Sequence, residues 1–227
     1  MGEMEFVTID EGNGVQLSAR LYKPPEGLGE GNKNLAVVLV HQYSVLGGCQ
    51  GLLKGMATLL AARGYLSVTF DQRGAGRSTG RSTFTGSGEV NDAVAVCNWV
   101  AEKFPTSSIL LVGSSAGAPI AGSAVDQVDA VKGYVGLGYP FGMMASILFG
   151  RHNKPILTSQ KPKLFVMGTR DGFTSVKQLE NKLKNSSGRT EQILVPNAGH
   201  FEMEGPAFDE EMVRHCIEFA ESLDESS

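Results

Sequence analysis

The sequence predicts an α/β fold, in which a mostly parallel β-sheet carries helices on both faces. Three observations lead to this prediction: a hairpin signal near the start, a regular alternation of strand and helix patterns after it, and an early strand candidate that is apolar at every position. Strands that read as continuous apolar runs are typical of parallel sheets covered on both faces. The chain has 227 residues, of which 41% are hydrophobic and 19% charged, so residues 1–227 are expected to form one domain with a proper core.

The chain is expected to begin with two antiparallel strands. The predicted strands at residues 5–10 and 15–22 are joined by Glu11-Gly12-Asn13-Gly14, in which Asn-Gly is a strong hairpin signal. The segment 23–34 is rich in Pro, Gly and Glu and reads as a loop between strands. Residues 35–40 form a continuous apolar run, which predicts a strand buried on both faces.

Helix and strand patterns alternate from this point on. The predicted helix at residues 51–63 carries leucines and a methionine on one stripe, and Gly64 ends it. Residues 65–70 read as the next strand. Residues 89–104 read as a helix that Pro105 stops.

The second half of the chain continues the alternation. A strand at residues 108–112 leads through a tight turn into a helix that reaches about residue 125. The later strands are predicted at 131–137, 163–167 and 191–195, and the later helices at 175–184 and 206–223. The apolar stretch 138–149 between two of these strands forms either a helix packed in the core or one wall of a substrate pocket.

A candidate nucleophile stands on the turn after the strand 108–112. The segment Gly113-Ser114-Ser115-Ala116-Gly117 has the pattern G-x-S-x-G between a strand and a helix. Such a turn needs small neighbours, because its backbone is strained and the strand and helix pass close together. The middle residue, Ser115, would then present its hydroxyl at the top of the sheet; the alternative is a small residue at a tight turn.

An acid and a histidine follow two later strands. Asp171 comes directly after the predicted strand 163–167, and His200 follows the predicted strand 191–195. Because ligands of such sheets bind beyond the carboxyl ends of the strands, these side chains should lie near Ser115. The order Ser115, Asp171, His200 is the nucleophile, acid and histidine order that goes with this turn.

Other roles for the same residues stay open at this point. Asp171 could instead cap a helix that starts near Phe173, since Asp is a good N-cap, and His200 could be a loop histidine. Glu202 and Glu204 are weaker candidates for the acid, because they follow His200 too closely to come from another strand.

Two loops carry a resemblance to a known family. Asp71-Gln72-Arg73-Gly74-Ala75-Gly76-Arg77-Ser78 matches the loop D-x-R-G-x-G-x-S of the α/β-hydrolase superfamily, and the segment 41–48, with its paired Gly47-Gly48, is similar to the oxyanion loop of small bacterial hydrolases. The chain resembles an α/β-hydrolase over nearly its full length. It is most similar to the small, cap-less branch related to dienelactone hydrolases and serine-peptidase-like hydrolases. It departs from that branch at Gln42, where Pro or Gly usually follows the histidine.

The resemblance implies acyl transfer through a catalytic triad. Ser115 would attack a carbonyl carbon, and His200 would take its proton and later give it to the leaving group. Asp171 would orient His200 and stabilise its cationic form. Activity is therefore expected to rise with pH as His200 loses its proton, with a midpoint near about 6.5 or somewhat above.

The developing negative charge needs two preorganised donors. We expect the backbone N–H of Ala116 to be one and the backbone N–H of Tyr43, or alternatively Gln42, to be the other. The expected substrate pocket is shallow and mostly apolar, with Tyr43, Phe141 and Met144 among its lining residues.

The predicted function is a carboxylesterase-like serine hydrolase that cleaves an ester, thioester or amide of a small molecule. An acyltransferase or an enzyme that cleaves a carbon–carbon bond beside a ketone would use the same three side chains. A different class also stays open, since the same scaffold can serve a non-hydrolytic small-molecule receptor or interaction protein.

Several polar residues near the expected site read as structural. His41 is expected to brace the oxyanion loop, and Asp71 and Arg73 to fix the loop under the site through a charge-assisted bond. Glu89 and Asp92 fall in the first turn of a predicted helix, where negative charge suits the helix dipole.

Composition limits the possible partners. The net charge of −4 and the lack of a basic stretch argue against nucleic-acid binding and against a polybasic membrane anchor. No stretch of about 18 apolar residues is present, and no apolar signal region precedes the first strand, so a cytoplasmic location is expected. The sequence leaves open whether the protein is a monomer or a homodimer. No metal or other cofactor is expected, because the four histidines show no metal-ligand spacing and His152 and His215 read as packing or solvent residues. The cysteines are odd in number and widely spaced, without a C-x-x-C pair, so all three are expected to be free thiols: Cys49, Cys97 and Cys216.

Overall fold

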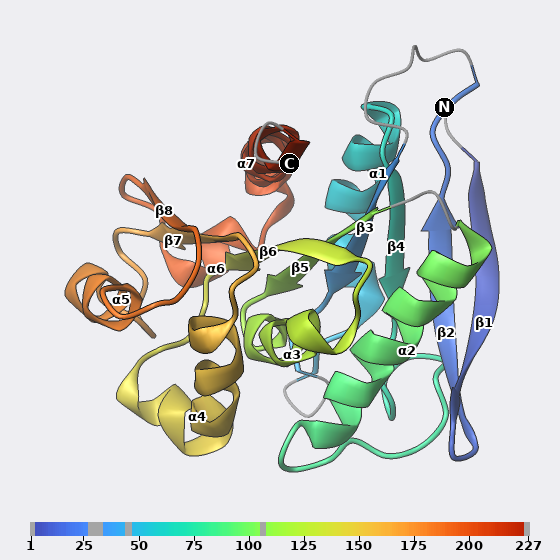
Figure 1. Ribbon diagram of the computed structural model, residues 1–227, viewed down its shortest axis with the longest axis horizontal. Coiled ribbons are helices and arrows are strands. Elements are labelled where there is room, and N and C mark those ends of the chain that lie inside the picture. The colour runs from blue at the N-terminus through green and yellow to red at the C-terminus, as the bar shows by residue number, and fades with distance from the viewer. Residues whose placement is uncertain (1–2, 27–33, 44–46, 105–107, 225–227) are drawn as a thin grey trace.

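A single eight-stranded sheet runs through the molecule (Figure 1). The computed structural model describes residues 3–26, 34–43, 47–104 and 108–224, and for residues 143–149 and 224 the backbone alone. The strand order is β1-β2-β4-β3-β5-β6-β7-β8; β1 with β2 and β2 with β4 pair antiparallel, and the remaining neighbours pair parallel. The strands are β1 (Met4–Gly12), β2 (Val15–Tyr22), β3 (Leu35–Val40), β4 (Leu66–Phe70), β5 (Ser108–Ser114), β6 (Val131–Leu137), β7 (Lys163–Gly168) and β8 (Thr190–Val195). The predicted fold class, a mostly parallel sheet with an antiparallel N-terminal hairpin, is confirmed.

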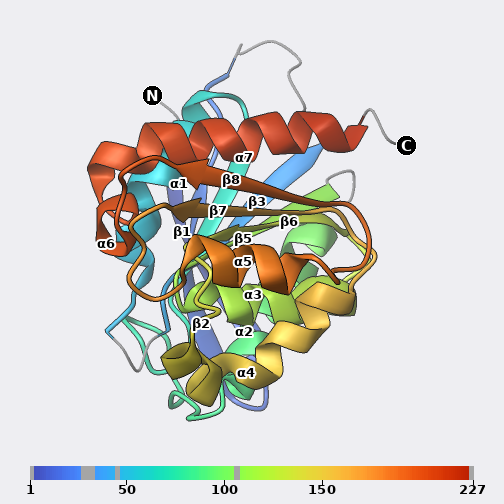
Figure 2. The same cartoon turned by 90° about the vertical axis from the view of Figure 1, so that its left-hand side faces the viewer.

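Helices cover both faces of this sheet. They are α1 (Lys54–Ala62), α2 (Ser87–Lys103), α3 (Gly117–Ala124), α4 (Met143–Thr158), α5 (Val176–Leu183), α6 (His200–Met203) and α7 (Asp209–Asp224). Figure 2 shows α7 along one side of the sheet and α3, α4 and α5 on the other. The buried clusters agree with this view, because side chains of α1 and α7 share one cluster and side chains of α2 and α3 share the second.

Two predicted helices differ in detail from the observed ones. The helix expected at residues 51–63 begins as a 3-10 turn, Gln50–Leu53, before α1 starts. The helix expected at 206–223 is also divided, into a 3-10 turn at Pro206–Phe208 and α7. The short helix α6 was not predicted, because four residues are too few for a helical apolar period to show in a sequence.

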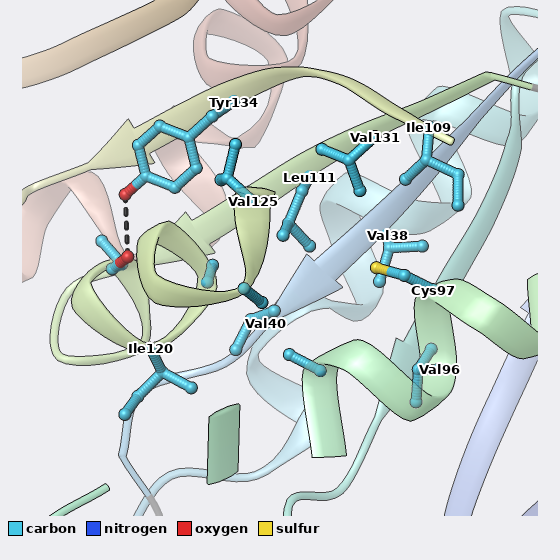
Figure 3. Packing of buried hydrophobic residues seen from close by; sticks show 14 of the residues in the cluster. Val38, Val40, Val96, Cys97, Ile109, Leu111, Ile120, Val125, Val131 and Tyr134 are labelled. Atoms are coloured by element: carbon cyan, nitrogen blue, oxygen red, sulfur yellow. Dashed lines mark hydrogen bonds between the residues drawn. The ribbon is translucent and has the colours of Figure 1, made fainter. Parts of the chain in front are cut away.

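The larger buried cluster lies between the sheet and the helices α2 and α3 (Figure 3). Val38 and Leu111 from neighbouring parallel strands are fully buried in it, as the continuous apolar runs predicted. Tyr134 is also fully buried, and its hydroxyl donates a 2.8 Å hydrogen bond to the carbonyl oxygen of Ala118, the dashed line in Figure 3. The bond satisfies the buried hydroxyl and fixes the start of α3 against β6.

The loop after β4 is held by buried carboxylates. Asp71 accepts hydrogen bonds from the backbone N–H of Gln50 (3.0 Å), from its side-chain amide (2.9 Å) and from the backbone N–H of Arg77 (3.2 Å). Arg73 pairs instead with Asp92 of α2, at 2.9 Å from Nε and 2.7 Å from a terminal nitrogen. Each residue therefore fixes a different part of the loop.

The prediction that two acids fall in the first turn of α2 is correct for Glu89 and wrong for Asp92, because the helix begins at Ser87. Asp92 is fully buried and binds both the side chain and the backbone N–H of Arg73. Glu89 is fully buried as well and accepts hydrogen bonds from the backbone and the hydroxyl of Thr83. Hydrogen bonds to residues before the helix thus hold both carboxylates, and sequence periodicity carries no signal for such partners.

The thiols are as expected: Cys49 is half-buried, Cys97 and Cys216 are buried, and all three are free. His152 packs inside, bonded to the hydroxyl of Ser123 and the carbonyl of Thr85. Among the residues that the structure describes, no helix is both long and apolar enough to cross a bilayer.

Candidate active site

Ser115 stands in a strained turn between β5 and α3. Its φ of 52° lies in the left-handed region, which residues other than glycine rarely adopt. The surrounding structure holds it there, because the N–H of Ser115 donates to the carbonyl of Leu137 (2.7 Å) and its carbonyl accepts from the N–H of Ala118 (2.9 Å). Strain of this kind, maintained by neighbouring strands, is typical of functional positions.

Close contacts explain the two glycines of the turn. A Cβ on Gly113 would overlap the backbone of Ala118, and a Cβ on Gly117 would overlap the carbonyl oxygen of His41. The second contact also presses the loop after β3 against the turn that bears Ser115. The two loops predicted to supply oxyanion donors therefore lie side by side.

A continuous row of hydrogen bonds links three side chains from different strand ends. The Oγ of Ser115 lies 2.6 Å from Nε2 of His200, and Nδ1 of His200 lies 2.6 Å from Oδ2 of Asp171. Because Asp171 is an acceptor, Nδ1 carries a proton and Nε2 of a neutral ring is free to accept one from the hydroxyl. In Figure 2 the arrowheads of β7 and β8 point to the side where α6, which begins at His200, is found.

Asp171 holds its position through its second oxygen. Oδ1 accepts from the backbone N–H of Phe173 (2.7 Å) and of Thr174 (2.9 Å), while Oδ2 faces His200. Asp171 is not the N-cap of a helix near Phe173, because α5 begins at Val176 and Ser175 caps it. The carboxylate instead closes a tight turn with one oxygen and orients the histidine with the other.

Glu204 contacts the opposite edge of the same imidazole. Glu204 follows His200 by four residues, and its Oε1 lies 3.3 Å from Nε2 of the histidine. As expected, Glu204 is not the acid on Nδ1; however, sequence reasoning assigned it no place in the site at all. Burial alone lowers the pKa of His200, but the hydrogen bonds and charges of Asp171 and Glu204 outweigh it and raise the pKa to about 9. This value lies well above the midpoint expected from the sequence.

His41 braces the loop after β3. Its Nε2 accepts from the backbone N–H of Gln72 (3.1 Å), so Nδ1 carries the proton and donates to the carbonyl of Gln42. The side-chain amide of Gln72 in turn donates to the carbonyl of His41 (2.8 Å). Burial lowers the pKa of His41 to about 4, so the ring is neutral. These bonds fix the backbone that leads to Tyr43.

The predicted pocket residues have different surroundings. Phe141 is buried and stacks on Tyr139 with ring centroids 4.0 Å apart, and Tyr43 is also buried. The side chain of Met144 lies outside the described part of the chain. Pocket roles for these residues, and the oxyanion roles of Ala116, Tyr43 and Gln42, stay predictions.

Two exposed aromatic rings border His200, and sequence reasoning did not identify them. Phe173 is 44% exposed and lies 4.6 Å from the imidazole; Phe201 is 71% exposed and lies 5.4 Å from it, both measured between ring centroids. Phe173 follows Asp171 by two residues and Phe201 follows His200 directly. This nearness in the chain is the one feature of the sequence that could have indicated them.

The fold and these contacts define the class: an α/β serine hydrolase without a cap, in which α4 alone connects β6 to β7. The family model of the X-Pro dipeptidyl-peptidase (S15) family matches residues 13–137, more than half of the chain. The chain belongs to this family.

Solved structures of α/β hydrolases have a similar fold. An α/β serine hydrolase homologue from Coxiella burnetii is 26% identical, with a TM-score of 0.77 over 94% of this chain and 96% of that one. A lid-less α/β serine hydrolase from Xanthomonas campestris is 22% identical, with a TM-score of 0.78 over 95% and 94% of the two chains. An esterase from Pyrococcus furiosus is 20% identical, with a TM-score of 0.77 over 97% and 93%. The last two show likeness of fold alone. None of the curated proteins matches the sequence.

Proposed function

We propose that this chain is a serine hydrolase that cleaves a small-molecule ester, thioester or amide through an acyl-enzyme on Ser115. The observation that carries the proposal is the hydrogen-bonded row from Ser115 Oγ through His200 to Asp171, with the serine in a left-handed turn. In the first step Oγ bonds to the carbonyl carbon while its proton passes to Nε2 of His200. The same proton then goes to the leaving group, and water repeats the sequence to release the acid.

The tetrahedral intermediate carries a negative charge that the site must stabilise. Ala116 follows the nucleophile and forms the N-cap of α3, and His41, two residues before Tyr43, lies against Gly117 of the same turn. We assign the backbone N–H groups of Ala116 and Tyr43 to the oxyanion, with Gln42 as the alternative to Tyr43. Losing one such donor typically costs about 3 kcal/mol of barrier.

Esters are the favoured substrates because aromatic side chains border the base. Phe173 and Phe201 present exposed rings beside His200, which suits an apolar acyl or alcohol group next to the reacting carbonyl. A second candidate is peptide-bond cleavage, favoured by the match to a peptidase family over residues 13–137. Since this region ends before Asp171 and His200, it includes the nucleophile alone of the three reactive groups.

Covalent labelling tests the proposal directly. A fluorophosphonate probe should label the wild-type protein and the Ser114→Ala control but not Ser115→Ala. A panel of p-nitrophenyl esters, thioesters and X-Pro amides then separates esterase from peptidase, and added alcohol or amine acceptors reveal acyl transfer. A folded wild-type protein that no probe labels would instead indicate the non-hydrolytic receptor or interaction protein.

A further inference from the structure

His200 lies between two carboxylates, one at each ring nitrogen. Asp171 faces Nδ1 at 2.6 Å and Glu204 faces Nε2 at 3.3 Å. The proposed hydrolase, on which this inference rests, needs only the first of these contacts. A base must have an unprotonated Nε2 to accept the hydroxyl proton of Ser115, whereas a carboxylate at Nε2 favours the protonated ring.

The carboxylate of Glu204 is built into the site. Its Oε1 is buried and receives no well-formed hydrogen bond from the described residues, so the oxygen has unused acceptor capacity next to Nε2. Burial raises the pKa of this carboxyl group, but polar interactions with His200 and with the hydroxyl of Ser115 outweigh it. The side chain of Gln42 adds to them, and the net effect lowers the pKa of Glu204. Glu204 is therefore ionised at neutral pH.

No described cation offsets this negative charge at the imidazole. The charged groups that act on His200 are Asp171, from the loop after β7, and Glu204, which follows α6. Glu202 on α6 uses its carboxylate to accept from the N–H of Gly199. Uncharged groups also contact the ring: the Ser115 hydroxyl, the backbone of Gly138 and the aromatic side chains of Phe173 and Phe201.

We propose that Glu204 is a positioning residue that retains the Nε2 proton on His200, so that hydrolysis becomes efficient only as the medium turns alkaline. In the resting state the imidazolium is stabilised between two carboxylates and cannot act as a base. As the pH rises the ring loses the Nε2 proton to solvent, and Ser115 can then donate its own. With the pKa of His200 at about 9, the rings in the basic form are a small minority at pH 7.

Removing the charge should change the pH profile in a characteristic way. In Glu204→Gln the midpoint of kcat/KM should fall by about one pH unit or more, because an opposite charge at this distance typically shifts a pKa by that amount. Activity at neutral pH should rise severalfold, while the alkaline plateau should stay equal or fall because the ring is a weaker base. A merely structural role would lower activity at every pH without moving the midpoint.

The experiment measures kcat/KM for an activated ester between about pH 6 and pH 10 in wild type, Glu204→Gln and the control Glu221→Gln. Glu221 is an exposed residue near the end of α7, so the control makes the same chemical change away from the site. We expect a lower midpoint in Glu204→Gln alone. Equal midpoints in wild type and Glu204→Gln would overturn the proposal.

An NMR titration of the histidine rings separates this proposal from the proposed function. It needs no turnover, and the His200 signal is identified by its loss in a His200→Gln variant. A lower ring pKa in Glu204→Gln supports the role of Glu204 even if no ester is cleaved, and an unchanged ring pKa refutes it even in an active enzyme. If Glu204→Gln fails to fold, Glu204→Ala takes its place in both measurements.

Discussion

Replacing Asp171 by Asn tests the hydrogen-bonded row most sharply. Oδ1 of Asp171 accepts from two backbone N–H groups, of Phe173 and Thr174, so the amide oxygen of Asn must take this place. Its NH2 group then faces Nδ1 of His200, where the carboxylate oxygen lies 2.6 Å away in the wild type. Because NH2 can only donate, Nδ1 must become the acceptor and the ring proton moves to Nε2. The nitrogen that faces Ser115 is then no longer a base.

The size of the expected fall in kcat follows from this change of tautomer. Loss of the base through the wrong tautomer typically lowers kcat by about 10⁴-fold, which corresponds to about 5 kcal/mol of barrier. Stability should change by only about 1–2 kcal/mol, because Asn keeps both backbone bonds of the turn. The assay combines kcat/KM for an activated ester with the rate of fluorophosphonate labelling and with urea unfolding.

One result would refute this reasoning. If folded Asp171→Asn kept activity within about tenfold of wild type, the tautomer of His200 would not depend on Asp171.

Three further outcomes are expected. Asp92→Asn should lower the free energy of unfolding by about 2 kcal/mol in urea titrations, because it removes the charge-assisted bonds between Asp92 and Arg73 and leaves Glu11, at 3.0 Å, as the charged partner of the guanidinium; a change below about 0.5 kcal/mol would contradict this. Phe201→Ala and Phe173→Ala should each raise KM for aromatic esters by about threefold to tenfold and leave acetate esters nearly unchanged; equal effects on both ester types would exclude the rings from binding. An aromatic disulfide reagent should titrate Cys49 alone in the native protein, since burial raises the pKa of both other thiols to about 12; rapid reaction of a second thiol would contradict it.

The main features of the fold could be predicted because local patterns and global topology agree. The runs that became β2, β3 and β6 have the predicted bounds, and Asn13 in the first hairpin turn has a positive φ of 49°, as its turn type requires. Ser115, Asp171 and His200 could be brought together from sequence because carboxyl ends of parallel strands meet at one edge of a sheet.

What sequence reasoning missed depends on distances that no periodicity encodes. Glu204 was set aside because the acid that binds Nδ1 of the histidine is expected to come from another strand. That argument does not apply to Nε2, which a side chain four residues after His200 can contact. Phe173 and Phe201 were missed because exposed rings leave no apolar period. Asp92 was explained by the helix dipole although its partner, Arg73, lies in another segment of the chain.

In the chain, Ser115 precedes α4, and Asp171 and His200 follow it. Cutting the polypeptide there would yield a fragment holding Ser115 and another holding the imidazole and carboxylate, and neither would be competent by itself. The two fragments would rejoin along β6 and β7, which pair from Tyr134 with Lys163 to Leu137 with Val166. Turnover regained on mixing would report that docking, which makes this scaffold suitable for a two-piece reporter.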